Sequence, residues 1–330
     1  MTSTDIAIIG AGPTGLYGAY CAGFRGLRTV VVDALPQVGG QISALYPEKE
    51  VRDVAGLPGI LGRSLVDALK TQAAAYDPVY LLGRQAVELS RDEERRPVVT
   101  LSDGTAVRAG AVLLTSGIGT FTPRPLPGGD EWLGRGLDYF VPDLSEHTGR
   151  DVVVVGGGDS AVDWSLALAP LARSVTLVHR RAAFRAHAAG VAAARVAGVR
   201  IVVDSQVVAL SGGDRVERAH LRTRDAADRE LPADSVIAAL GFISDLGPLA
   251  GWGLALRGRS VLVDQRMRTS LPGVYAAGDL TEYDGKVRLM SVGFGEVATA
   301  VNNAAVELDP GLSLFPGHST DTPQSNRSDS

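Results

Sequence analysis

The chain has little cysteine, no long apolar run and no excess of positive charge, and each shortage excludes a class of protein. Its 330 residues contain one cysteine, Cys21, so no disulfide can form within the chain, which fits a reducing compartment. No apolar stretch approaches the roughly 20 residues needed to cross a bilayer, and the apolar start at residues 6–9 is too short for a secretion signal. The net charge of -5 gives no sign of nucleic-acid binding. We therefore expect a cytoplasmic protein that binds neither membranes nor nucleic acid.

Glycine, by contrast, is abundant, and its placement is informative. The 40 glycines lie mostly in short clusters flanked by apolar runs, and hydrophobic residues make up 45% of the chain. This pattern is typical of repeated strand-to-helix turns over a sizeable core and not of a low-complexity chain. The length is enough for two domains of ordinary size.

A dinucleotide-binding pattern begins near the N-terminus. Residues 5–9 are a predicted strand, residues 10–15 spell GAGPTG, residues 16–26 are a predicted helix, and residues 29–33 are a second strand. The G-x-G-x-x-G glycines permit a tight turn and close approach of the backbone to a pyrophosphate, which the N–H groups at the helix start attract. An acid at the end of the second strand can accept hydrogen bonds from a ribose hydroxyl. These candidate residues are Gly10, Gly12, Gly15 and Asp33.

The same pattern recurs near the middle of the chain. The predicted strands of this copy are residues 151–155 and 175–178. Residues 162–171 are a predicted helix, although Pro170 shortens it. Between the first strand and the helix, residues 156–161 spell GGGDSA, which fits G-x-G-x-x-A. The position 23 residues after the first glycine, which holds Asp33 in the first copy, holds His179 here, and two arginines follow it.

This exchange of charge distinguishes the two copies. An acid suits the plain ribose of FAD or NAD and repels a 2′-phosphate, whereas Arg180, Arg181 and the nearby Arg185 can bind a 2′-phosphate through charge-assisted hydrogen bonds. The first site is therefore predicted to bind FAD and the second NADPH, although a solvated strand end is an alternative explanation for the arginines. The candidate NADP residues are Gly156, Gly158, Asp159, Ser160, Ala161, His179, Arg180, Arg181 and Arg185.

Both copies also end alike. Residues 112–117 and residues 235–241 are apolar strands that end in small residues and glycine, and each follows a segment typical of a small antiparallel hairpin. This internal repeat at the scale of a domain predicts an α/β fold with two Rossmann-like dinucleotide-binding domains.

These features resemble the two-dinucleotide-domain flavoprotein reductases of the thioredoxin reductase type. Residues 272–279, PGVYAAGD, are similar to the segment of that family whose aspartate, here Asp279, binds the flavin ribityl chain. The resemblance implies a discontinuous FAD-binding domain, with the NADPH-binding domain inserted in it and Gly- and Pro-rich crossings as hinges. The expected FAD domain is residues 1–119 plus 241–330, with a C-terminal extension at about 310–330, and the expected NADPH domain is residues 120–240.

The chain departs from thioredoxin reductases in one respect. Those enzymes carry a C-x-x-C pair shortly before the second glycine motif, where residues 136–143 of this chain read GLDYFVPD. Without that pair the chain cannot pass electrons through an internal dithiol. Cys21, on the first predicted helix, is expected to be a small buried thiol.

A narrower resemblance covers nearly the whole chain. The thioredoxin-reductase-like ferredoxin–NADP reductases share its motifs, apart from the EVR at residues 50–52, where aromatic and apolar residues are usual. The matching motifs are GGQISALYPEK at residues 39–49, DVAG at 53–56, HRR at 179–181, FRAH at 184–187, GFGE at 293–296, VNNA at 301–304 and GHST at 317–320.

The resemblance implies roles for individual residues. Tyr46 would stack on one face of the isoalloxazine, and His318 would cover the other face, reaching across a homodimer. A helix at about residues 289–308 would direct its N-terminus at the flavin pyrimidine. No catalytic residue beyond the flavin and no metal site is expected. Other residues implied to line the FAD site are Thr14, Asp33, Gln41, Val87, Phe121, Asp279 and Thr320.

The implied activity transfers a hydride between NADPH and FAD and single electrons to ferredoxin or flavodoxin. An NADPH oxidoreductase of the same fold that acts on a quinone, a low-molecular-weight disulfide or oxygen is an alternative, because the fold does not fix the acceptor. A non-catalytic flavin redox sensor is a second alternative, against which the presence of both nucleotide motifs argues.

An acidic ferredoxin would favour a basic docking surface, and six scattered basic residues are candidates for it. An ordinary solvated face explains them equally well. They are Lys49, Arg52, Arg63, Lys70, Lys286 and Arg288.

Overall fold

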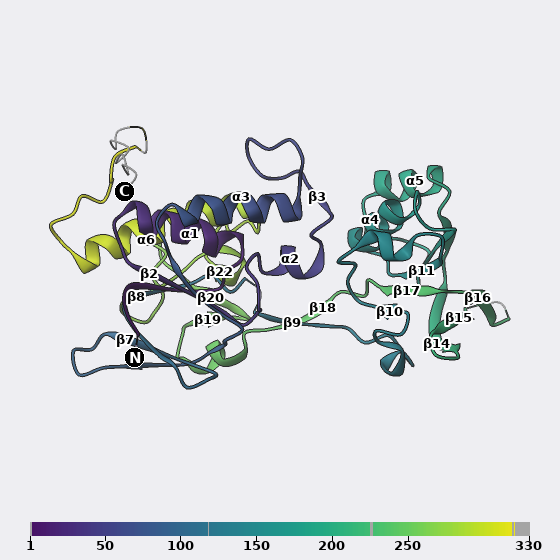
Figure 1. The fold of residues 1–330 in the computed structure, drawn as a ribbon, viewed down its shortest axis with the longest axis horizontal. Helices are drawn as coiled ribbons and strands as arrows, with labels where there is room; N and C mark the ends of the chain where they lie inside the picture. The colour runs from purple at the N-terminus through teal and green to yellow at the C-terminus, as the bar shows by residue number, and fades with distance from the viewer. Residues whose placement is uncertain (1, 118, 225–226, 319, 321–330) are drawn as a thin grey trace, which may run out of the picture. The chain divides into compact units, whose positions relative to one another are not determined.

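The computed structural model describes residues 2–117, 119–224, 227–318 and 320, and these form two compact units (Figure 1). The first unit comprises the described residues within Met1–Ser43, Val51–Thr120 and Asp245–Ser330. The second unit comprises those within Ala44–Glu50 and Phe121–Ser244. The chain passes between them at β9 (Thr120–Pro123) and β18 (Phe242–Asp245), which pair as a two-stranded sheet.

The first unit is built on a seven-stranded sheet with β1 and β8 at its centre. The strand order is β5-β2-β1-β8-β7-β6, and β21 pairs with the end of β8. The pairs β5–β2, β2–β1, β1–β8 and β8–β21 are parallel, while β8, β7 and β6 form an antiparallel meander. The strands are β1 (Thr2–Ile9), β2 (Thr29–Asp33), β5 (Val79–Leu82), β6 (Ala86–Arg91), β7 (Pro97–Leu101), β8 (Ala106–Leu114) and β21 (Val274–Ala276).

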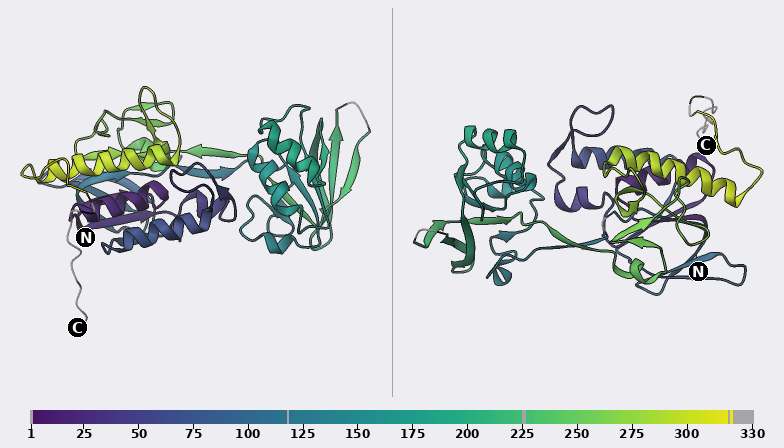
Figure 2. Two further views of the ribbon diagram at one scale, coloured as in Figure 1. Left: turned by 90° about the horizontal axis from the view of Figure 1, so that it is seen from above. Right: turned by 180° about the vertical axis from the view of Figure 1, so that it is seen from behind.

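The helices of the first unit cover one face of this sheet. In both views of Figure 2 and in Figure 1, α3, α1 and α6 lie side by side over it. The small sheet β19-β20-β22 and the 3-10 helix η3 contribute to the core on the other face. The remaining elements are α1 (Pro13–Phe24), α2 (Gln41–Leu45), β3 (Glu50–Val51), β4 (Ile60–Leu61), α3 (Gly62–Ala74), η3 (Gly247–Gly251), β19 (Leu256–Arg257), β20 (Ser260–Leu262), η4 (Gly278–Leu280), β22 (Thr281–Glu282) and α6 (Met290–Leu308).

The continuous apolar run of β1 is explained by burial on both faces. Ile6 and Ile8 pack with residues of α1 and α6, whereas Ala7 and Ile9 pack with residues of η3 and β20. Because successive side chains of a strand point to opposite faces, a strand covered on both sides must be apolar at every position. The pattern of residues 5–9 therefore reflects a central parallel strand.

The second unit repeats this plan on a smaller scale. Its sheet has the order β10-β17-β11-β12-β13 with all pairs parallel, and an antiparallel sheet β14-β15-β16 follows. Val152 and Val154 of β11 pack with α4 and α5, and Val153 and Val155 pack with the antiparallel sheet. The elements are η1 (Asp130–Trp132), β10 (Leu137–Asp138), η2 (Leu144–His147), β11 (Asp151–Val155), α4 (Asp159–Leu168), β12 (Ser174–Val178), α5 (Ala188–Val196), β13 (Arg200–Val202), β14 (Ser205–Gly212), β15 (Val216–Thr223), β16 (Arg229–Pro232) and β17 (Ser235–Ala238).

The predicted α/β fold class with two parallel-sheet dinucleotide units is confirmed, but both first helices begin earlier than predicted. The helices begin at Pro13 and Asp159, three residues before the predicted starts, because the second glycine of each motif is itself the N-cap. The glycine motifs thus enter the first helical turn. Helix α4 also ends at Leu168 and not at residue 171, since Pro170 lacks the N–H needed to continue it.

We predict that the centre of the first sheet governs the stability of the first unit. Ile8 is fully buried, so Ile8→Ala should cost about 2–5 kcal/mol through lost contacts and a residual cavity. Val79 on the edge strand β5 is 52% exposed, and Val79→Ala is the matched control. Calorimetry should show a clearly lower unfolding temperature for the first variant alone. Equal changes in both variants would contradict this account of the core.

Candidate functional site

The first glycine turn leaves no room for side chains at two of its three glycines. Gly10 has a φ of +116°, and a Cβ there would lie 2.5 Å from the Thr115 carbonyl oxygen. A Cβ on Gly15 would lie 1.8 Å from the Gly10 carbonyl oxygen. On Gly12 the nearest atom to a Cβ is the Gly40 Cα at 4.0 Å. Gly10 and Gly15 therefore permit close packing of the backbone, while the space beside Gly12 is bordered by the backbone of Gly40.

The start of α1 and the end of β2 meet at this space. The N-cap Gly12 supplies no side-chain hydrogen bond to the first turn of the helix. The carboxylate of Asp33 accepts hydrogen bonds from the Ala11 N–H at 2.6 Å and the Leu35 N–H at 2.8 Å. Burial raises the pKa of the Asp33 carboxyl, and those two N–H groups oppose the rise. The turn and the acid thus form one unit that could hold the pyrophosphate and ribose of a dinucleotide.

A second loop packs directly on the first glycine turn. The Gly39 N–H donates to the Ala11 carbonyl oxygen at 2.8 Å, and a Cβ on Gly40 would lie 3.0 Å from the Gly12 Cα. Gln41 begins α2 at the end of this loop, and its Nε2 would lie 3.2 Å from a Cβ on Gly117. The structure therefore brings Gln41 to the same place as the glycine turn.

Thr14 lies where the glycine turn, η4 and α6 converge. A Cβ on Gly278 would lie 3.1 Å from Thr14 Oγ1, and a Cβ on Gly293 would lie 2.8 Å from the same oxygen. Gly278 begins η4, which carries the half-buried Asp279, and Gly293 lies in the first turn of α6. The N-cap of α6, Leu289, gives no side-chain cap either. Asp279 and the start of α6 are thus fixed beside the predicted FAD site.

Other predicted FAD residues have individual surroundings. The Val87 carbonyl oxygen accepts a hydrogen bond from Trp252 Nε1 at 3.3 Å. The side chain of Phe121 lies outside the described part of the structure. His318 and Thr320 are exposed, and the ring of His318 stands edge-on to Phe315 with centroids 5.1 Å apart.

Tyr46 belongs to the second unit and so is not grouped with Thr14 and Asp33. It packs against the helix-side core of that unit, and Lys49 Nζ lies 6.0 Å from the centroid of its ring. Lys49 also forms a 2.5 Å ion pair with Asp163 of α4. The segment Ala44–Glu50 therefore has its own anchors within the second unit.

The second glycine turn has the same steric plan as the first. A Cβ on Gly156 would lie 2.5 Å from the Ala239 carbonyl oxygen and 2.8 Å from the Cβ of Ala161, which replaces the third glycine. On Gly158, the N-cap of α4, a Cβ would meet only Arg185 Nη2, at 3.7 Å. The space beside Gly158 is therefore bordered by a guanidinium, as a site for a phosphate requires.

Backbone contacts hold the arginine segment against this turn. The Gly157 carbonyl oxygen accepts from the N–H groups of Arg185 at 2.8 Å and Ala186 at 3.2 Å. Asp159 Oδ1 accepts from the His187 N–H at 2.9 Å. These bonds place Arg185 beside the turn, and Arg180 and Arg181 are exposed at the end of β12 on the same segment. Ser160, the next residue of α4, is also exposed.

His179 has a different place from the arginines that follow it. Its ring atoms would lie as close as 2.1 Å to a Cβ on Gly157, so only glycine fits above it. Its Nε2 lies 3.2 Å from the Ala183 carbonyl oxygen, and its ring packs on Phe184. Burial, with a smaller contribution from the neighbouring arginines, lowers the pKa of His179. In this structure the imidazole supports the glycine turn from beneath.

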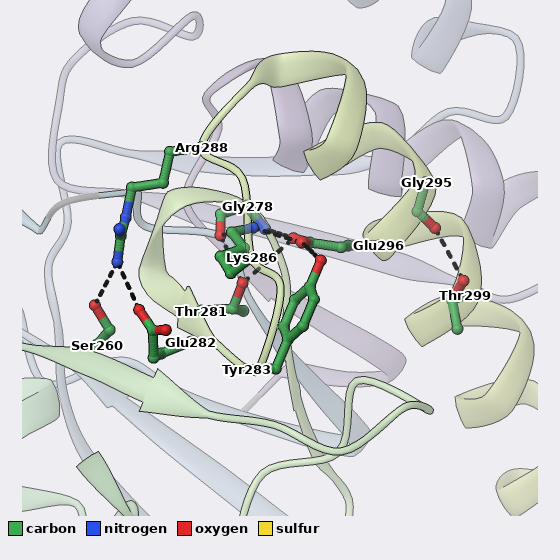
Figure 3. Close-up of polar contacts among 10 residues, drawn as sticks. All are labelled: Ser260, Gly278, Thr281, Glu282, Tyr283, Lys286, Arg288, Gly295, Glu296 and Thr299. Carbon is green, nitrogen blue, oxygen red and sulfur yellow. Dashed lines mark hydrogen bonds and ion pairs between the residues drawn. The ribbon is translucent and has the colours of Figure 1, made fainter. Parts of the chain in front are cut away.

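One polar cluster of the first unit was missed by the sequence analysis. Lys286 is a candidate surface residue there, but its side chain is 2% exposed and pairs with Glu296 of α6 (Figure 3). The prediction that Lys286 belongs to a docking surface is therefore wrong. The available signal was Glu296, an acid in the small and apolar first half of α6, because a buried carboxylate needs a partner.

The described residues include no candidate metal site and no candidate membrane span. Among them, no three His, Cys, Asp or Glu side chains are grouped so as to hold a metal ion. None of the helices in that part of the chain has the length and apolar character needed to cross a membrane.

The chain is similar to known proteins along almost its whole length. A family model described as pyridine nucleotide-disulphide oxidoreductase matches residues 4–304. A ferredoxin–NADP reductase of a Nocardioides species is 58% identical over 96% of this chain and 97% of its own length. The enzyme of the same name from Salinispora arenicola is 58% identical over 97% and 99%.

Solved structures share the fold. Thioredoxin reductase of T. acidophilum superposes with a TM-score of 0.79 at 24% identity, covering 93% of this chain and 99% of that one. Two glycine turns on parallel sheets, each followed by a helix whose N-cap gives no side-chain hydrogen bond, agree with these similarities. The chain therefore belongs to the pyridine nucleotide-disulphide oxidoreductase family.

Proposed function

We propose that the chain is an NADPH-dependent flavoprotein reductase that uses FAD to pass single electrons from NADPH to ferredoxin or flavodoxin. Relatives named ferredoxin–NADP reductase at 58% identity over nearly the full length support the acceptor. The observation that carries the coenzyme assignment is the contrast between the two glycine turns. One is closed by the carboxylate of Asp33, and the other is bordered by Arg185 with Arg180 and Arg181 nearby.

The first unit would hold FAD. The uncapped start of α1 would bind its pyrophosphate, Asp33 its adenosine ribose and Asp279 its ribityl chain, with Thr14, Gln41, Val87 and Phe121 as further lining residues. Bound FAD supplies the exchange between two-electron transfer from NADPH and one-electron transfer to the acceptor. The chain's own task is to orient the two dinucleotides and to limit access of water and oxygen.

The second unit would hold NADPH. Gly156, Gly158, Ser160 and Ala161 form the turn for its pyrophosphate, and the exposed Arg180 and Arg181 would bind the 2′-phosphate with Arg185. His179 and Asp159 would contribute by supporting the turn and the arginine segment, as their contacts with Gly157 and His187 suggest. This charge pattern favours NADPH over NADH.

Four further assignments complete the proposal. The functional domains are residues 1–119 plus 241–330 for FAD and residues 120–240 for NADPH. Tyr46 and His318 cover the two faces of the isoalloxazine, with His318 supplied across a homodimer, and Thr320 lines the FAD site. The protein works in the cytoplasm. The rivals are a reductase of quinones, low-molecular-weight disulfides or oxygen, and a redox sensor without turnover.

The coenzyme preference is testable by removing the arginines. Arg180→Ala with Arg181→Ala should raise the KM for NADPH at least about tenfold, because each lost charge-assisted bond contributes about 1.5–3 kcal/mol, and should leave NADH use nearly unchanged. Arg195→Ala with Arg200→Ala, at two exposed sites of the same unit, is the control. Equal use of NADPH and NADH by the unmodified protein would rule the assignment out.

The identity of the electron acceptor is testable with a panel of candidate acceptors and one cysteine variant. Burial raises the pKa of the Cys21 thiol to about 12, so it stays protonated at neutral pH and is a poor nucleophile. The unmodified protein and Cys21→Ser should both reduce ferredoxin and a one-electron dye with NADPH, and neither should reduce thioredoxin. Faster turnover with a quinone or a low-molecular-weight disulfide than with ferredoxin would favour the rival reductase. Absence of turnover with every acceptor would favour the sensor.

The role of the C-terminal extension is testable by truncation. A chain ending at Gly317 should still bind FAD, because the contacts at Thr14, Asp33 and Asp279 remain, but its flavin absorption band and its rate of reoxidation by oxygen should change. A chain ending at Thr320 is the control and should match the full chain. If both truncated chains keep the original spectrum and oxygen reactivity, His318 does not cover the flavin.

A further inference from the structure

An ion pair is buried next to the predicted FAD site. The side chains of Lys286 and Glu296 are 2% and 4% exposed, and Nζ and Oε1 are 2.5 Å apart (Figure 3). Removing two charges from water is expensive, and an apolar pair of similar size often gives equal or better stability. The proposed hydride and electron transfers do not use either residue. The placement of this pair therefore needs a reason beyond stability.

The pair binds both polar groups of one peptide residue. Glu296 Oε2 accepts from the Gly278 N–H at 2.7 Å, and Lys286 Nζ donates to the Gly278 carbonyl oxygen at 3.0 Å. Two hydroxyls complete the cluster. Tyr283 donates to Glu296 Oε1 at 2.6 Å. Thr281 donates to the Gly278 carbonyl oxygen at 2.8 Å, and its Oγ1 lies 3.3 Å from Glu296 Oε2. Each oxygen of the buried carboxylate is thus occupied, and the orientation of Gly278 is set by both charges.

Gly278 is packed between Thr14 and Gly293. Its φ of +83° is a conformation that favours glycine. A Cβ on Gly278 would lie 3.1 Å from Thr14 Oγ1, and a Cβ on Gly293 would lie 3.3 Å from the Gly278 Cα. The ion pair therefore fixes the residue that precedes Asp279 against the first glycine turn and against the first turn of α6.

We propose that Lys286 and Glu296 are positioning residues that set the place of Asp279 and of the α6 N-terminus relative to the flavin. The inference rests on the proposed function, since it takes the first unit as the FAD site. The ion pair links three successive elements of the chain, namely η4, the loop after β22 and helix α6. An apolar pair would fill the same volume but would leave both polar groups of Gly278 without charged partners.

Three variants separate positioning from mere stability. Lys286→Met and Glu296→Gln each leave one buried charge without its partner and should lower the unfolding temperature. The double variant Lys286→Met/Glu296→Gln has no buried charge and should recover most of that temperature. In the double variant the carbonyl oxygen of Gly278 still lacks its ammonium partner. The dissociation constant of this variant for FAD should therefore be about tenfold higher than that of the unmodified protein. Its visible circular dichroism in the flavin band should also differ from that of the unmodified protein.

The control variant is Glu282→Gln. Glu282 lies on the same segment and pairs with the exposed Arg288 at 2.9 Å, so the chemistry of the substitution is matched outside the buried cluster (Figure 3). It should keep the FAD affinity and the flavin spectrum. All variants should bind NADP⁺ as the unmodified protein does, because the cluster lies in the first unit.

A double variant with the unfolding temperature, FAD affinity and spectrum of the unmodified protein would overturn the positioning role. Should the double variant fail to fold, Tyr283→Phe removes one hydrogen bond to Glu296 while keeping both charges, and should weaken FAD binding in the same direction by a smaller factor. An unaltered spectrum and affinity in that variant would then overturn the role. Failure of the proposed function is distinct, because it would be seen in the unmodified protein as absence of FAD binding or of ferredoxin reduction.

Discussion

The first glycine of each glycine turn approaches its own sheet so closely that no side chain fits there, and the rest of the two candidate sites depends on this approach. Gly15 packs on the Gly10 carbonyl, and Ala161 packs on Gly156 in the second turn. The first turns of α1 and α4 are thereby held beside the strand ends with N–H groups that no side chain caps. Two such helix starts, one per unit, provide two places for a pyrophosphate. The specificity of each place is then decided by the residues around it.

Those surrounding residues differ in kind between the two units. In the first unit they are polar groups held by backbone contacts, with Asp33 bound to Ala11 and with Thr14 in contact with Gly278. In the second unit they are cations on a segment that is bonded to Gly157. A carboxylate repels a 2′-phosphate, whereas a guanidinium attracts it, so one backbone plan can serve two different dinucleotides. The backbone thus forms each binding turn, and the side chains set which dinucleotide it prefers. This agrees with membership of the pyridine nucleotide-disulphide oxidoreductase family.

The fold class was predictable because its signals are local. The strands at residues 29–33 and 151–155 were predicted with the bounds that the structure has, and the 23-residue spacing located both glycine turns. The burial of Lys286 was not predicted, because its partner Glu296 lies on another element and no periodicity around residue 286 indicates the pair. The anchoring of Tyr46 within the second unit depends on a contact far along the chain, that of Lys49 with Asp163. The roles of Tyr46 and His318 toward the flavin stay predictions.

We propose that the two glycine turns hold different dinucleotides because of the charges beside them. A crystal structure of the chain with FAD and NADP⁺ bound is the decisive experiment. We expect the FAD pyrophosphate at the start of α1 with its ribose on Asp33, and the NADP⁺ pyrophosphate at the start of α4. We also expect the 2′-phosphate within about 3 Å of an Arg180, Arg181 or Arg185 nitrogen. A 2′-phosphate away from all three arginines, or FAD bound at Gly156–Gly158, would contradict this proposal.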